Sequence, residues 1–173
     1  MLAHISYLKQ LTTRASETDR QAIELDALGR TGEAQAFRWA CFARSLSVPH
    51  LRAYLKRLPD FDDVEAENRA MTHVLGYSNV HQGLEFLIAW PALDRANRLV
   101  LDRSDELNGD HYHLLGKAAV ALEARYPLAA TMLLRAMIDF ALSNARHKRY
   151  PHAARHLAEC GSLSARIADY LPH

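Results

Sequence analysis

The chain has 173 residues, of which 49% are hydrophobic and 24% are charged, and its formal net charge is +1. This length and composition fit one globular domain with a buried core. The near-zero charge excludes a global electrostatic attraction to nucleic acid or to an anionic membrane.

The N-terminal residues show no basic start followed by an apolar run of signal-peptide length. The longest apolar-rich window, from Leu128 to Leu142, contains Arg135 and Asp139 and is too short to span a bilayer. Cys41 and Cys160 form neither a CxxC motif nor a disulfide framework. We therefore expect a cytoplasmic protein with no membrane partner.

The chain carries frequent helix start and stop signals and almost no strand signals. Helices are predicted near residues 2–12, 19–29, 32–46, 49–58, 62–76, 79–89, 91–104, 111–125, 127–145, 151–160 and 163–170. N-cap candidates include Ser47, Ser78, Asp110 and Ser162, while Gly29 and Gly161 are candidate helix ends. The short connections favour antiparallel neighbours, and no low-complexity linker divides residues 1–173, so we expect a single all-helical domain.

One stretch of the sequence occurs twice. Residues 125–133 and 149–157 share the pattern R-Y-P-x-A-A-x-x-L, 24 positions apart. Proline suits the first turn of a helix, because its missing N–H has no intrahelical partner there. Trp90-Pro91 is a further aromatic–proline start. These repeated starts predict an all-α fold, a degenerate tetratricopeptide-like array of antiparallel hairpins with about nine to ten helices, and such arrays usually bind partners.

A comparison of the two copies separates expected core positions from expected surface positions. The shared residues are predicted to face the core: Ala129, Ala130 and Leu133 in the first copy, and Ala153, Ala154 and Leu157 in the second. The second copy replaces Leu128 and Met132 by His152 and His156. These replacements indicate that the helix of the second copy exposes a surface that differs from that of the first copy.

The segment from Phe140 to Ala158 contains no acidic residue. Its cations are Arg146, Lys148, Arg149 and Arg155, and Tyr150 adds an aromatic surface. Such a cluster suits an acidic protein segment, and alternatively a phosphate or a nucleic-acid backbone. A purely structural alternative is the favourable placement of cations at the C-terminus of the preceding helix.

His152, His156 and Cys160 are spaced four residues apart and can project from one helical face. Imidazole and thiolate are good zinc or copper ligands, so these residues are weak metal candidates. The alternative is a half-buried histidine stripe with Cys160 as a small core residue. No fourth ligand stands nearby in the sequence, although His147, or His111 and His113, can approach in three dimensions, and no cofactor is predicted.

Arg135 and Asp139 interrupt an otherwise apolar helix with i, i+4 spacing. We expect them to form a structural ion pair on a mostly buried helix. The functional alternative places Arg135 on the floor of a binding surface.

The sequence contains no GxSxG elbow, Walker loop, HExxH motif or dinucleotide glycine fingerprint. Cys160 lies toward a predicted helix C-terminus, where the helix dipole disfavours a thiolate nucleophile. We therefore expect a protein that is not an enzyme.

Four strings carry a family resemblance: residues 51–63 (LRAYLKRLPDFDD), 86–94 (FLIAWPALD), 133–140 (LLRAMIDF) and 152–160 (HAARHLAEC). From about Ala22 onward the chain resembles an uncharacterised bacterial family similar to the tetratricopeptide-like helical region of bacterial SWIM zinc-finger proteins. The resemblance implies no activity, and the zinc-finger ligands are absent from this sequence. It also implies a fragment or a short member of a longer family.

The leading hypothesis is a helical-repeat module that binds a protein or peptide, with an acidic ligand favoured. Nucleic-acid or phosphate binding through residues 146–156 is the alternative. The candidate face comprises Arg135, Asp139, Arg146, Lys148, Arg149, Tyr150, His152, Arg155, His156 and Glu159.

Overall fold

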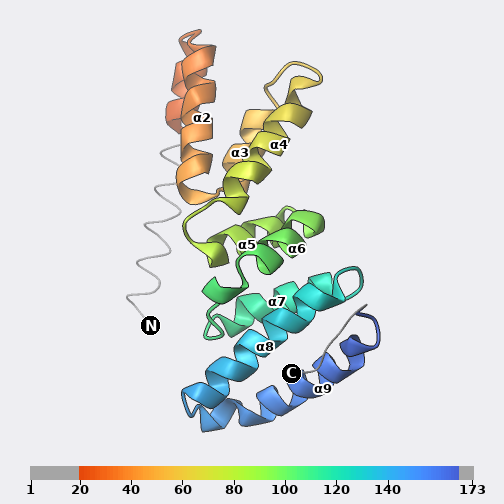
Figure 1. Cartoon of the computed structure of the whole chain (residues 1–173). Helices are drawn as coiled ribbons and strands as arrows, with labels where there is room; N and C mark the ends of the chain where they lie inside the picture. Colours follow the sequence, from red (N-terminus) through yellow and green to blue (C-terminus); the bar gives the residue numbers. More distant parts are fainter. Residues whose placement is uncertain (1–19, 168–173) are drawn as a thin grey trace. The chain divides into compact units, whose positions relative to one another are not determined.

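The computed structural model describes residues 20–167, which contain helices and no strand (Figure 1). Residues 20–27 are helical. The elements that follow are α2 (Thr31–Ser45), α3 (Val48–Leu55), α4 (Asp62–Leu75), α5 (Val80–Ala89), α6 (Leu93–Asp102), η1 (Ser104–Glu106), α7 (Tyr112–Leu122), α8 (Pro127–Ser143), η2 (His147–Arg149) and α9 (Tyr150–Ser164). The all-α prediction is confirmed, and packing between consecutive helices fits a helical-repeat array. The helix predicted near 2–12 lies outside the described residues.

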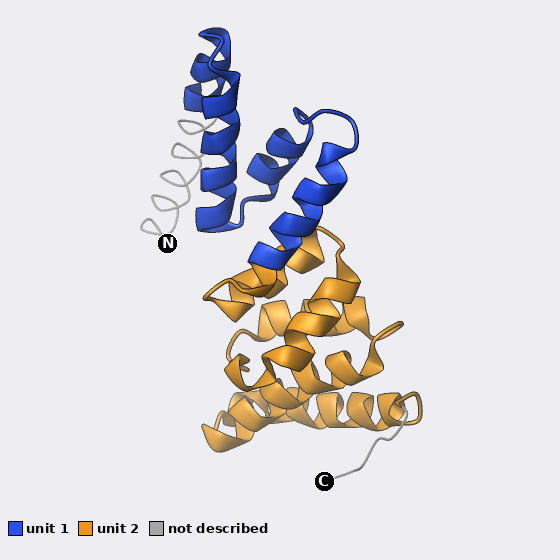
Figure 2. Cartoon of the chain, turned by 45° about the horizontal axis from the view of Figure 1, so that its top comes forward, with its two compact units in different colours: residues 1–73 blue, residues 74–173 orange. Residues whose placement is uncertain are grey.

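The chain divides into two compact units, residues 1–73 and 74–173 (Figure 2). In the first unit α2 packs against α3, and Phe42 and Leu51 are fully buried. Arg38 is buried as well, and its guanidinium forms an ion pair with Asp26. A buried guanidinium requires such a partner, because a desolvated charge without one is costly.

The second unit contains the hairpins α5–α6 and α7–α8 and the helix α9 (Figure 1). Helix α8 packs against α6, α7 and α9, which explains why it is apolar on several faces. Its buried residues include Ala129, Leu133 and Met137. The long apolar window of the sequence is therefore the central helix of this unit. Within residues 20–167, no helix is long and apolar enough to cross a membrane.

The helix predicted at 151–160 and the helix predicted at 163–170 are one helix over residues 150–164, so the predicted break at Gly161 is wrong. Residues 168–170 lie outside the described part. Gly161 sits on an exposed face of α9 with a negative φ, and one glycine inside a helix costs only about 1 kcal/mol relative to alanine. A single glycine is thus a weak helix stop when packing supports the helix on both sides of it.

The prolines of the repeat do start helices, since Pro127 and Pro151 both occupy the first turn of their helices. The predicted core positions are buried in the first copy. In the second copy only Ala153 is buried, and the prediction is wrong for Ala154, which is exposed, and for Leu157, which is 64% exposed. Helix α8 is covered by helices on several sides, whereas α9 packs mainly against α8.

The connection between α6 and α7 is held in place by Arg103 and Gly109. The Arg103 guanidinium donates hydrogen bonds to the carbonyl oxygens of Leu75 (3.3 Å), Tyr77 (2.7 Å) and Ser78 (3.4 Å). Gly109 lies so close to α8 that a Cβ atom there would be 2.1 Å from the Ala136 carbonyl oxygen. Only glycine permits such an approach, and the connection positions the start of α7 beside α8.

Candidate functional site

A groove of about 470 Å³ opens between α7 and α9. Met137 and Ala141 of α8 line it from below, because α7 and α9 both pack on α8. The residues that line this α7–α9 groove are Gly109, Tyr112, His113, Gly116, Lys117, Met137, Ala141, Lys148, Arg149, His152, Ala153, Arg155 and His156. Five of the ten residues of the predicted face are therefore brought together around one cavity.

The charged side chains that line the α7–α9 groove are all cationic. Four cationic side chains line it, and no carboxylate belongs to its lining within the described chain. Three imidazoles complete the polar part of the wall. The cations are Lys117, Lys148, Arg149 and Arg155, and the imidazoles are His113, His152 and His156. Asp110 and Glu159, which stand outside the lining, pair with Arg149 and Arg155 respectively, so part of this positive charge is already balanced. An anionic ligand would add contacts with Lys117 and Lys148 and could exchange with these partners.

Arg149 is the most constrained of these cations. Its Nη1 lies 2.9 Å from Oδ1 of Asp110, and its guanidinium carbon lies 4.5 Å from the centre of the Tyr112 ring. Nη1 is buried and, among residues 20–167, makes no hydrogen bond of acceptable geometry, so its contact with Asp110 is an ion pair and not a hydrogen bond. Asp110 was predicted to cap the following helix, but the N-cap residue of α7 is His111. Asp110 instead ties the start of α9 to the start of α7.

The exposed side of α9 carries a short polar chain. Nη2 of Arg155 lies 3.2 Å from Nδ1 of His152, and Nδ1 of His156 lies 3.0 Å from a carboxylate oxygen of Glu159. Arg155 and Glu159 also form a loose ion pair at 3.8 Å. Ion pairs this exposed contribute little to stability, so Arg155 can turn toward a ligand at small cost.

The histidine–cysteine stripe does not form a metal centre. Within residues 20–167, no three His, Cys, Asp or Glu side chains converge in a way that could hold a metal ion. Cys160 is buried against α8, where its Sγ lies 4.0 Å from the Thr131 carbonyl oxygen, while His152 is exposed. Burial raises the pKa of the Cys160 thiol, which further disfavours the thiolate that a metal would require.

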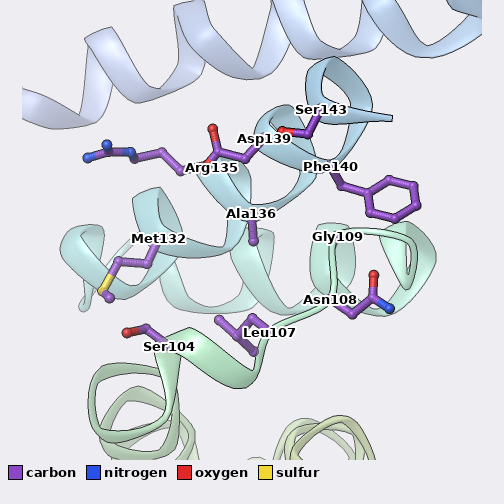
Figure 3. A pocket seen from close by; sticks show the side chains of 10 residues that line it. All are labelled: Ser104, Leu107, Asn108, Gly109, Met132, Arg135, Ala136, Asp139, Phe140 and Ser143. Atoms are coloured by element: carbon purple, nitrogen blue, oxygen red, sulfur yellow. The ribbon is translucent and has the colours of Figure 1, made fainter. Parts of the chain in front are cut away.

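Arg135 and Asp139 lie on another face of α8, beside a second cavity of about 480 Å³ (Figure 3). The ion pair predicted between them is absent from the described part of the molecule: the Arg135 guanidinium extends away from the Asp139 carboxylate. The helix is mostly buried, as expected, but both of these side chains are exposed, and the prediction of an ion pair between them is wrong. This cavity is also lined by Ser104 and Asn108 of the α6–α7 connection.

The remaining residues of the predicted face lie outside the α7–α9 groove. Arg146 has its guanidinium carbon 5.9 Å from the centre of the Phe140 ring. Tyr150 makes an edge-on contact with His147, whose ring centre is 5.1 Å away. These contacts explain how residues 146–150 are ordered into the turn that starts α9.

From the sequence, His113 was named only as a possible further metal ligand, and Lys117 and the rest of the α7 wall of the groove were missed. His113 and Lys117 are spaced four residues apart and are both exposed, so they lie on one helical face. Gly116 stands between them, and a Cβ atom there would meet no heavy atom within 4 Å. The i, i+4 spacing was visible in the sequence, but its orientation toward α9 follows only from the packing of both helices on α8.

A third cavity, of about 730 Å³, lies between α5 and α7. At one end of this α5–α7 groove the rings of His81 and His111 stack with their centres 4.0 Å apart. Nε2 of His81 accepts a hydrogen bond from the backbone N–H of Asn108 at 3.0 Å, which requires this nitrogen to be unprotonated. Burial lowers the pKa of His81, and the adjacent His111 lowers it further.

Comparison with protein families identifies the class of this protein. A profile described as "Family of unknown function (DUF6880)" matches residues 2–173, and the chain therefore belongs to this family. A search of curated proteins and a search of solved structures both find no match.

Proposed function

We propose that the protein is a binding module that holds an acidic peptide segment of a partner protein in the α7–α9 groove. The observation that carries this proposal is the lining itself, in which four cations and, among residues 20–167, no carboxylate face the cavity. Lysine and arginine side chains form charge-assisted hydrogen bonds with glutamate and aspartate, and arginine can do so with two bonds at once.

The form of the groove favours a peptide over a nucleic acid. Met137, Ala141 and Ala153 form a closed apolar floor, since no more than 6% of each residue is exposed, so the groove is a local recess. Nucleic-acid binders usually spread cations along a stripe that follows the phosphate backbone. Here they gather around about 470 Å³, in a chain whose net charge is +1.

The wider setting of this role is part of the same proposal. Tetratricopeptide-like hairpins would present the groove as a partner-binding surface, without a catalytic function, in the cytoplasm. The buried positions of Cys41 and Cys160 suit a reducing compartment, and the two thiols are not joined in a disulfide.

The direct test measures the anisotropy of a fluorescein-labelled octapeptide of four glutamates followed by four serines. The double variant Lys148→Glu, Arg155→Glu is expected to bind at least about tenfold more weakly, because a charge-assisted hydrogen bond contributes roughly 1.5–3 kcal/mol. Arg149 is left unchanged, since its contacts with Asp110 and Tyr112 support the start of α9.

The matched control is Arg98→Glu, Arg125→Glu, which makes the same change in net charge at exposed positions outside the groove. It should retain the affinity of the unmodified chain. Equal weakening by both double variants would show that only overall charge matters and would contradict a specific groove. Tighter binding of a single-stranded oligonucleotide than of the peptide, with a steep dependence on salt, would favour the nucleic-acid alternative instead.

A further inference from the structure

The α7–α9 groove and the α5–α7 groove are two parts of one surface. His113 and Lys117 of α7 line both cavities. Both side chains are exposed, so the border they form between the grooves is open to a ligand that contacts both. A partner held by the cations of α9 therefore has access to α5 without leaving the surface.

The three helices run alongside one another in the same direction. His81 near the start of α5 stacks on His111 at the start of α7, with ring centres 4.0 Å apart. Arg149 at the start of α9 lies over the ring of Tyr112 in the first turn of α7. Ile88 and Ala89, at the end of α5, consequently lie beside Lys117, whose side chain also faces α9.

The α5–α7 groove differs in chemistry from its neighbour. Glu85 and Asp110 line it, so an acidic ligand residue is disfavoured there. Ile88, Ala89 and Leu114 supply apolar surface, with Ala89 exposed and the other two half-buried. Most of the lining is polar, and these three residues form one apolar corner of it. An apolar corner beside a cationic groove is the arrangement expected for an apolar anchor that follows a charged segment.

The geometry points to a ligand of two parts: an extended peptide whose acidic residues occupy the α7–α9 groove and whose next apolar side chain enters the α5–α7 groove between Ile88, Ala89 and Leu114. This inference rests on the proposed function and adds a second binding site, the α5–α7 groove, for an apolar side chain of the same peptide. Helix α5 packs on α7, whereas α7 and α9 both pack on α8 and are separated by the groove. Packed helices lie roughly 8–10 Å apart, so the path from α9 across α7 to α5 is on the order of 20–25 Å. An extended chain covers such a path with about six to eight residues.

The experiment uses the full chain and the same labelled octapeptide, with leucine placed in turn at each of its four serine positions. One of these peptides is expected to bind about tenfold more tightly than the serine parent, because burying leucine is favourable. Ala89→Gln should abolish that gain by placing an amide in the apolar corner, while leaving the affinity for the serine parent within about twofold.

The matched control is Ala154→Gln, an equally small change at an exposed position of α9 outside both grooves. This variant should keep the gain from leucine, and circular dichroism should show both variants to be as helical as the unmodified chain. If the serine parent binds but leucine at none of the four positions raises the affinity more than about twofold, the two-part ligand is overturned. Binding of the acidic residues in the α7–α9 groove would still stand. Absence of binding by every peptide up to about 1 mM would overturn both proposals.

Discussion

Alanine in place of Gly109 and alanine in place of Gly116 are the same chemical change with opposite expected effects. A Cβ atom at Gly109 would lie 2.1 Å from the Ala136 carbonyl oxygen and 2.7 Å from Cβ of Phe140. Because these contacts involve backbone and a Cβ atom, no side-chain rotation relieves them, and we expect Gly109→Ala to lower the free energy of unfolding by about 3 kcal/mol. At Gly116 a Cβ atom meets nothing within 4 Å, so Gly116→Ala should raise it by about 1 kcal/mol.

Urea unfolding followed by far-ultraviolet circular dichroism measures both changes against the unmodified chain. The two variants should differ from each other by about 4 kcal/mol. A neutral Gly109→Ala variant would refute the close approach of the α6–α7 connection to α8. Destabilisation by Gly116→Ala would mean that other atoms already occupy the space beside Gly116 on the α7 wall of the groove.

Three further expectations concern single side chains. Arg103→Met removes the donors to the carbonyls of residues 75–78 and should lower the free energy of unfolding by about 2–3 kcal/mol in urea titrations; no loss would contradict that network. Burial lowers the pKa of His81 in the folded chain, so as the pH falls the unfolded chain takes up a proton at this residue before the folded chain does. The free energy of unfolding should therefore decrease as the pH drops below about 6.5. His81→Gln should flatten this dependence, which is measured as the urea midpoint at a series of pH values. In a Cys41→Ala background, Cys160 should react with a thiol reagent at least about a hundredfold more slowly when native than in denaturant, and comparable rates would contradict its burial.

The helices were predictable because local signals and packing agree along most of the chain. The apolar window of residues 128–142 and a proline in the first turn of both α8 and α9 specify helix, and these two helices begin within one residue of the predicted starts. The break predicted at Gly161 is wrong because a glycine on an exposed helical face does not by itself end a helix. Its cost is small beside the packing of α9 on α8.

The repeat located the candidate site but assigned part of its surface wrongly. Equivalent residues such as Leu133 and Leu157 share a local sequence, yet one is buried and the other is 64% exposed. Burial depends on which helices cover each copy, and a single copy's sequence does not contain that information. The same reason kept Lys117 out of the predicted face, since its neighbours across the groove belong to a helix about thirty residues further along the chain.

The separation of Arg135 and Asp139 from the groove has a similar origin. Their i, i+4 spacing places them on one face of α8, but spacing alone does not reveal which neighbouring element faces them. In the structure that neighbour is the α6–α7 connection rather than α9. Sequence therefore defined the helical faces, and tertiary packing decided which of these faces meet.

A substitution at Gly116 tests most directly whether the proposed acidic peptide lies in the α7–α9 groove. Gly116→Leu places a side chain in the open groove, where the added Cβ has no neighbour, without changing any charge. This variant is expected to stay helical and to bind the labelled glutamate–serine peptide at least about tenfold more weakly, whereas Gly116→Ala should retain most of the affinity. Unchanged affinity of a folded Gly116→Leu variant would show that the peptide does not bind in this groove.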